Sequence, residues 1–201
     1  MNLYLIVNNN LIDNLKYSDD AIDLVRTLRL LSIEGESDAK KISEMSNLSD
    51  IESIYSSYYA SSIDSSKYLS EKYSLDINLD KRLNDCKVGI LQGKNIKLVK
   101  NLQEHDFNYK LYNGESLNEV GLRMNSVIEE VVSNNENCAL YTHKRSILGY
   151  FLRFASVGYN LDDELILEYN NKVIYSTSDK LVEVYKLTFN NNKLEDVEIV
   201  L

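Results

Sequence analysis

Apolar and polar positions along the chain predict strands and helices in alternation through about residue 156. Leu3 to Val7 is a short apolar run that passes directly into Asn8, Asn9 and Asn10, which is the pattern of a buried strand. Similar runs follow, and one of them leads into Thr142 and His143. The predicted strands are residues 3–7, 51–56, part of 75–83, and 138–141.

Between these strands, apolar residues recur at helical spacing. The clearest case begins at Ser116, where Ser116 and Glu119 have the spacing of a capping box and an apolar stripe follows to Val131. The predicted helices are residues 19–31, 36–46, 60–73, a short one near 94–102, 117–131 and 146–156.

The tail has a different pattern, with three strand-like segments at 172–177, 181–189 and 194–201. The last two flank Asn190-Asn191-Asn192, which suits a hairpin turn because Asn tolerates positive φ. Strands that alternate with helices favour a three-layer α/β/α fold with a mostly parallel central sheet, to which the tail adds antiparallel strands.

Domain organisation is simple. The chain has 201 residues with neither repeats nor a low-complexity linker, so we expect one domain over 1–201. Residues 84–113 are irregular and contain Gly89 and Gly93, which makes them the candidate for a cap or insertion over a pocket.

Charge and composition exclude several classes of function. A net charge of −9 argues against a nucleic-acid partner, which requires clustered Lys and Arg. No apolar run approaches the ~18 residues of a spanning helix, and the N-terminus lacks a signal-peptide pattern, so a cytoplasmic protein with reduced Cys86 and Cys138 is expected. With only His105 and His143, a three-histidine metal site is impossible, and no metal or other cofactor is expected.

Several segments, in order, resemble the histidine phosphatase superfamily, also called the phosphoglycerate-mutase-like family. The resemblance covers about residues 3–160. The matching segments are Leu3 to Ile6, Leu31 to Ala39, Ile54-Tyr55-Ser56-Ser57, Arg82-Leu83-Asn84-Asp85 with Gly89 and Gly93, Gly114-Glu115-Ser116-Leu117 with Arg123, and Leu140-Tyr141-Thr142-His143. The resemblance implies a phosphoglycerate-mutase-like fold and phosphoryl transfer through a phosphohistidine.

The catalytic motif of that family is degenerate here. The family's Arg-His-Gly triplet falls on Val7-Asn8-Asn9, so Val7 replaces an arginine and Asn8 replaces the nucleophile. An amide nitrogen is no substitute for imidazole, because its lone pair is delocalised into the carbonyl. Ser61 replaces the second arginine, while Asp85 and His143 remain as remnants of the acid and the second histidine.

These changes remove positive charge from the expected pocket. Lys144 follows His143 in place of the family's glycine, and with Arg145 it lies at a predicted helix start. We therefore expect only His143 and Lys144, with some help from Arg145, to face an anion, and phosphate binding to be weakened by several powers of ten. The pocket positions predicted by the resemblance are Val7, Asn8, Ser61, Asp85, His143 and Lys144.

Three hypotheses about function follow. The first is a pseudo-phosphatase with a binding or regulatory role, whose partner is a small polar or anionic ligand or another protein. The second is an active phosphatase or mutase with a rebuilt site that uses His143 or His105 as nucleophile. The third is a structural partner of an active relative. For Asn8, a simple capping role and a pocket role both stay open, as do structural roles for His143 and Asp85.

Overall fold

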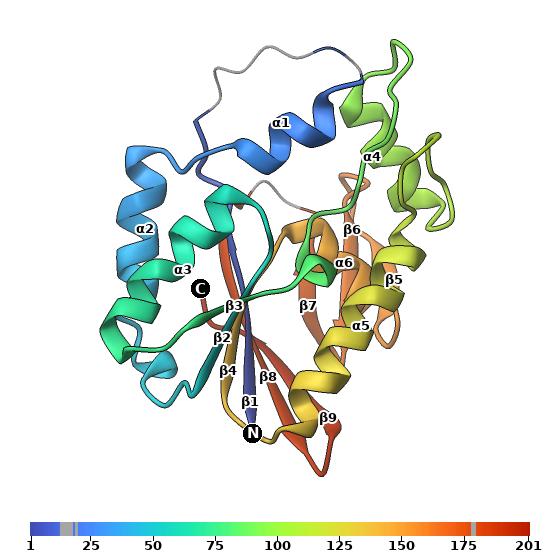
Figure 1. Ribbon diagram of the computed structural model, residues 1–201. Helices are drawn as coiled ribbons and strands as arrows, with labels where there is room; N and C mark the ends of the chain where they lie inside the picture. Colours follow the sequence, from blue (N-terminus) through green and yellow to red (C-terminus); the bar gives the residue numbers. More distant parts are fainter. Residues whose placement is uncertain (13–17, 19, 178–179) are drawn as a thin grey trace.

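A six-stranded sheet forms the centre of the computed structural model, which describes residues 1–12, 18, 20–177 and 180–201 (Figure 1). The strand order is β3-β2-β4-β1-β8-β9. The first four strands are parallel, while β8 is antiparallel to β1 and β9 is antiparallel to β8. The bounds are β1 Asn2–Asn8, β2 Ser53–Ser56, β3 Ile77–Leu79, β4 Cys138–Tyr141, β8 Val182–Asn190 and β9 Lys193–Ile199.

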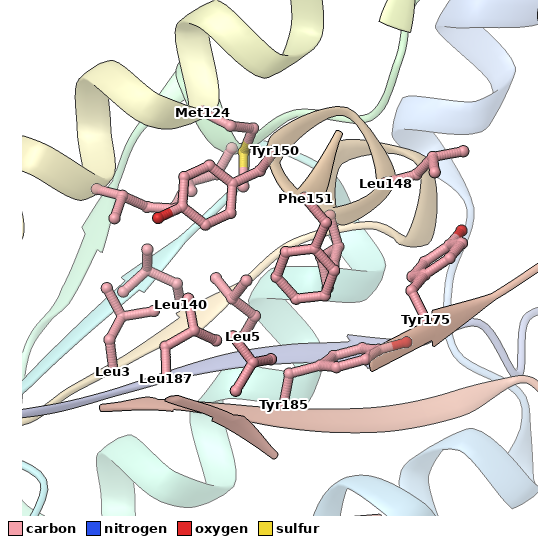
Figure 2. Packing of buried hydrophobic residues seen from close by; sticks show 14 of the residues in the cluster. Leu3, Leu5, Met124, Leu140, Leu148, Tyr150, Phe151, Tyr175, Tyr185 and Leu187 are labelled. Carbon is pink, nitrogen blue, oxygen red and sulfur yellow. The ribbon is translucent and has the colours of Figure 1, made fainter. Parts of the chain in front are cut away.

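Helices cover both faces of this sheet, which confirms the predicted three-layer fold. Alternation along β1 sends Leu3 and Leu5 into one buried cluster, with α5 and α6, and Tyr4 and Ile6 into the other, with α2 and α3. Figure 2 shows the first cluster, in which Met124, Tyr150 and Phe151 from the helices face Leu5 and Leu187 from the strands. The helices are α1 Ile22–Leu28, α2 Ile33–Ser43, α3 Ala60–Tyr73, α4 Ile96–His105, α5 Leu117–Ser133 and α6 Lys144–Phe151, with short 3₁₀ turns at Ser46–Leu48 and Lys81–Leu83.

Local sequence signals explain where several elements begin and end. The Ser116 side chain accepts from the backbone of Glu119 and the Glu119 side chain accepts from the backbone of Ser116, so the predicted capping box starts α5. Asn191 and Asn192 have φ of 48° and 62°, and they form the predicted turn between β8 and β9. Residue 19, the first of the helix expected at 19–31, lies outside the described residues.

The region after α6 differs from the prediction. The helix expected over 146–156 starts earlier, at Lys144, and ends at Phe151. A separate three-stranded antiparallel sheet follows, formed by β5 (Ser156–Tyr159), β6 (Leu165–Tyr169) and β7 (Lys172–Ser176). Only β7 was expected. β5 is short and largely exposed and therefore carries little hydrophobic pattern, whereas β6 has the alternating pattern of a strand, with Leu165 and Leu167 buried, and the prediction overlooked it.

Candidate anion-binding cavity

A cavity of about 770 Å³ opens at the carboxyl ends of the parallel strands, where ligands bind in open α/β sheets. Its walls come from α1, α4, the starts of α3 and α6, and residues near β7 and β8. In Figure 1, α1 and α4 lie above this end of the sheet. Because α4 belongs to the irregular 84–113 segment, that segment supplies part of the cavity wall.

Four of the six expected pocket positions line this cavity, namely Ser61, Asp85, His143 and Lys144. Among the described residues, Val7 and Asn8 are not part of the lining. Val7 is fully buried in the core cluster beside α5 and α6. The position at which the resemblance would place an arginine is therefore part of the core in this protein.

The Asn8 side chain is held by hydrogen bonds within the fold. Its Nδ2 donates to the carbonyl oxygen of Gly35 at 2.8 Å, and its Oδ1 accepts from the Asn10 amide at 3.3 Å. Gly35 also permits the close approach of the Asn10 backbone, since a Cβ at position 35 would lie 2.2 Å from the Asn10 carbonyl oxygen. The arrangement matches the capping role considered for Asn8 and leaves its amide nitrogen engaged as a donor.

His143 occupies the N-cap position of α6, where its side chain makes no capping hydrogen bond and instead lines the cavity floor. Its Nε2 is 2.9 Å from the Ser57 Oγ and 3.4 Å from the Ser62 Oγ, and its ring lies 4.4 Å from that of Tyr59. Burial lowers the pKa of His143 from 6.5 to about 4, although the nearby Asp85 opposes the change. The imidazole is therefore neutral at pH 7.

This buried imidazole should make stability depend on pH. The folded pKa of about 4 is lower than the ordinary 6.5, so the unfolded chain binds the extra proton first and stability is lost as pH falls between these values. At about 1.4 kcal/mol per pKa unit, the loss is about 3 kcal/mol. We expect the free energy of unfolding in urea to fall between pH 7 and pH 4 in both proteins. The fall should be about 3 kcal/mol larger for wild type than for His143→Gln. The same pH dependence in both proteins would contradict a lowered pKa of the buried His143.

Asp85 forms a buried ion pair with Arg26 of α1. Burial alone would raise the pKa of Asp85, but the Arg26 guanidinium, with a smaller contribution from His143, lowers it to about 2. Arg26 also contacts the Asp23 carboxylate at 3.3 Å and donates to the Cys86 carbonyl at 3.0 Å. Asp85 is thus an ionised partner of Arg26 and has no proton to donate at neutral pH.

The cavity carries much more positive charge than expected from the motif. Among the described lining residues, seven are cationic and two are acidic, and the acids are Asp85 and Glu104. The expectation that only His143, Lys144 and Arg145 face an anion is therefore wrong. The seven cations are Arg26, Arg29, Lys97, Lys100, Lys144, Arg145 and Lys180.

A signal for part of this charge was present in the sequence. Lys97, Lys100, Asn101 and Glu104 have i, i+3, i+4, i+7 spacing, which places them on one face of α4. All four line the cavity, while Val99 on another face is buried against α1. Comparison with the family motif alone misses this face, because 84–113 is the segment expected to be an insertion.

His105 lies apart from the cavity lining. Its side chain is exposed at the end of α4, where it stacks on Tyr159 at 5.1 Å and lies 3.4 Å from the Asp163 carboxylate. A role for His105 as a replacement nucleophile therefore lacks the required geometry. The two cysteines are free and buried. Within the described chain, no group of three or more His, Cys, Asp or Glu residues is placed to hold a metal ion, and no helix is long and apolar enough to span a membrane.

Comparison with known structures finds the same fold. A mycobacterial glucosyl-3-phosphoglycerate phosphatase in complex with inorganic phosphate is 15% identical, with a TM-score of 0.67 over 100% of this chain and 95% of the other. Mycobacterial hydrolase 1 is 15% identical, with a TM-score of 0.66 over 100% and 96% of the two chains. Bacillus stearothermophilus YhfR is 16% identical, with a TM-score of 0.62 over 96% and 94%.

The sequence itself carries the family assignment. A search of curated proteins finds no significant match. The profile of the histidine phosphatase superfamily (branch 1), in contrast, matches residues 29–178, which is most of the chain. This protein therefore belongs to the histidine phosphatase superfamily.

Proposed function

We propose that the protein is a pseudo-phosphatase that binds a small anionic molecule, most simply a phosphate-bearing one, without hydrolysing it. The observation that carries this proposal is the combination of a cavity lined by seven cationic side chains with an asparagine at the nucleophile position. The chain as a whole has a net charge of −9, so this concentration of positive charge is local. Such a site attracts an anion but has no imidazole at the position where the resemblance places the nucleophile.

The shape of the cavity supports a small organic ligand. A volume of about 770 Å³ lies within the range of about 300–1,000 Å³ that is typical of small-molecule sites. Tyr59, Tyr175 and Leu181 give the wall apolar area beside the charged groups. A structural relative has been solved with inorganic phosphate, which favours phosphate as the anionic group.

An active phosphatase that uses His143 is the second candidate. It is favoured by one observation, namely that His143 lines the cavity and is unprotonated at pH 7, as a nucleophile must be. Against it, the Nε2 atom is already engaged with Ser57 and Ser62. Asp85 is also held ionised by Arg26, so it cannot protonate a leaving group.

Turnover of a generic aryl phosphate separates the two candidates. We expect wild-type protein to release phenolate no faster than His143→Gln at pH 5 to 8. We also expect intact-mass measurement without acid treatment to show no added phosphoryl group. Turnover or a phosphoryl adduct that disappears in His143→Gln would establish the active enzyme and contradict the pseudo-phosphatase.

A further inference from the structure

The cations on the floor of the cavity already have carboxylate partners. Three cations, Arg26, Lys144 and Arg145, are largely buried, and each lies within ion-pair distance of an acidic side chain that is also mostly buried. Their charge is therefore balanced before any ligand arrives. The pairs are Arg26 with Asp85, Lys144 with Glu183 at 3.3 Å, and Arg145 with Glu104 at 2.9 Å.

Three lysines in the cavity lining are different. Lys97 and Lys100 project from the cavity-facing side of α4, and Lys180 lies just before β8. No carboxylate in the described part of the chain lies within 4.0 Å of any of these three ammonium groups. These three lysines are therefore the candidates for contact with the negative charge of a ligand.

Lys100 is the most confined of the three. Burial lowers its pKa, and the nearby Arg26 and Arg145 lower it further, although Asp85 and Glu104 partly compensate. A half-buried ammonium group in these surroundings would be stabilised by an added negative charge. Lys97 and Lys180 are exposed, and their flexible stems can bring ammonium groups to the same anion.

We propose that the anionic group of the ligand binds to the cavity-lining lysines Lys97 and Lys100 of α4 and Lys180 before β8, and not at His143. The inference rests on the proposed binding function. The ligand class is a phosphate or diphosphate whose charge of two or more matches three ammonium groups. Any organic body would then extend toward Tyr59 and Tyr175, which line the same cavity.

Calorimetric titration with inorganic phosphate and pyrophosphate, at low and constant ionic strength, tests this location. We expect pyrophosphate to bind wild type, Lys100→Gln to bind about tenfold more weakly, and Lys97→Gln/Lys100→Gln/Lys180→Gln to bind at least about a hundredfold more weakly. His143→Gln should keep wild-type affinity within about threefold. The control Lys41→Gln/Lys81→Gln/Lys193→Gln removes the same charge from exposed lysines outside the cavity lining and should also keep it. Thermal unfolding checks the fold of each variant.

The possible outcomes distinguish failure of the proposed lysine site from failure of the proposed anion-binding function. If wild type binds and His143→Gln abolishes binding while the triple cavity variant does not, the anion binds at the floor and the inference is overturned, although the binding function stands. If both triple variants lose affinity equally, the effect is one of general charge and the location is again overturned. If neither probe binds wild type, both the inference and the proposed function fail.

Discussion

A variant with the family's motif restored should bind inorganic phosphate at least about a hundredfold more tightly than wild type. The substitutions are Val7→Arg, Asn8→His and Ser61→Arg, together with Lys144→Gly. Two guanidinium groups would return to the floor, and each charge-assisted hydrogen bond to an anion is worth about 1.5–3 kcal/mol. The restored imidazole should also become phosphorylated by an aryl phosphate.

The structure explains why Asn8→His is compatible with the fold. Asn8 uses Nδ2 to donate to the Gly35 carbonyl, and the Nδ1 of histidine occupies the equivalent place on the side chain. A histidine protonated at Nδ1 can therefore keep this hydrogen bond, which leaves Nε2 with the lone pair that attacks phosphorus.

The fourth substitution is required by Lys144. Glu183 lies directly opposite Val7 in the β1–β8 ladder, so both side chains are on the same face of the sheet. The Lys144 ammonium now pairs with Glu183 at 3.3 Å. An arginine at position 7 can take over this carboxylate only when Lys144 is removed.

The matched control is the same variant with Lys144 retained, which should be less stable and gain less affinity. Calorimetry with inorganic phosphate measures the affinity, and intact mass measures phosphorylation. A folded four-substitution variant that binds phosphate no better than wild type would show that these positions do not form a phosphate site.

Lys144→Met should destabilise the protein by about 3–5 kcal/mol. Glu183 has a side chain only 5% exposed and contacts Lys144, which is itself 14% exposed. Removing the ammonium leaves a buried carboxylate without its partner, and breaking buried pairs in this way typically has such a cost. Urea unfolding at pH 7 measures the change.

Two controls identify the cause of that loss. Lys172→Met breaks an exposed ion pair with Asp196 and should cost at most about 1 kcal/mol. Lys144→Met/Glu183→Gln removes both charges and should recover much of the lost stability. The Lys144 ammonium also lies 5.7 Å from the centre of the Tyr175 ring. If the double variant is as unstable as Lys144→Met, the effect comes from the loss of this contact and not from the unpaired charge.

Strong local patterns made most of the fold predictable. Three elements are specified by interactions between residues close in sequence. They are marked by the apolar run at Leu3–Val7, the capping box at Ser116 and the turn at Asn190–Asn192. The exposed strand Ser156–Tyr159 was missed because its pairing with β6, and not its own pattern, makes it a strand.

Residues of the cavity lining were predicted only at positions that belong to the family motif. Ser61, Asp85, His143 and Lys144 were found by resemblance, and they line the cavity. Comparison of motifs covers only the motif positions, so it missed the cations that α1 and α4 bring to the cavity, such as Arg26 and Lys100. Their convergence depends on how the 84–113 segment packs over the sheet, which the pattern of a single helix does not specify.

One ³¹P NMR experiment tests the central claim most directly, because it reports binding and hydrolysis together. Phenyl phosphate is observed alone and with increasing amounts of wild-type protein at pH 7. We predict that its resonance broadens or shifts with protein concentration while no inorganic phosphate signal grows over hours. An unchanged resonance would contradict anion binding, and a growing inorganic phosphate signal that is absent with His143→Gln would contradict the loss of catalysis.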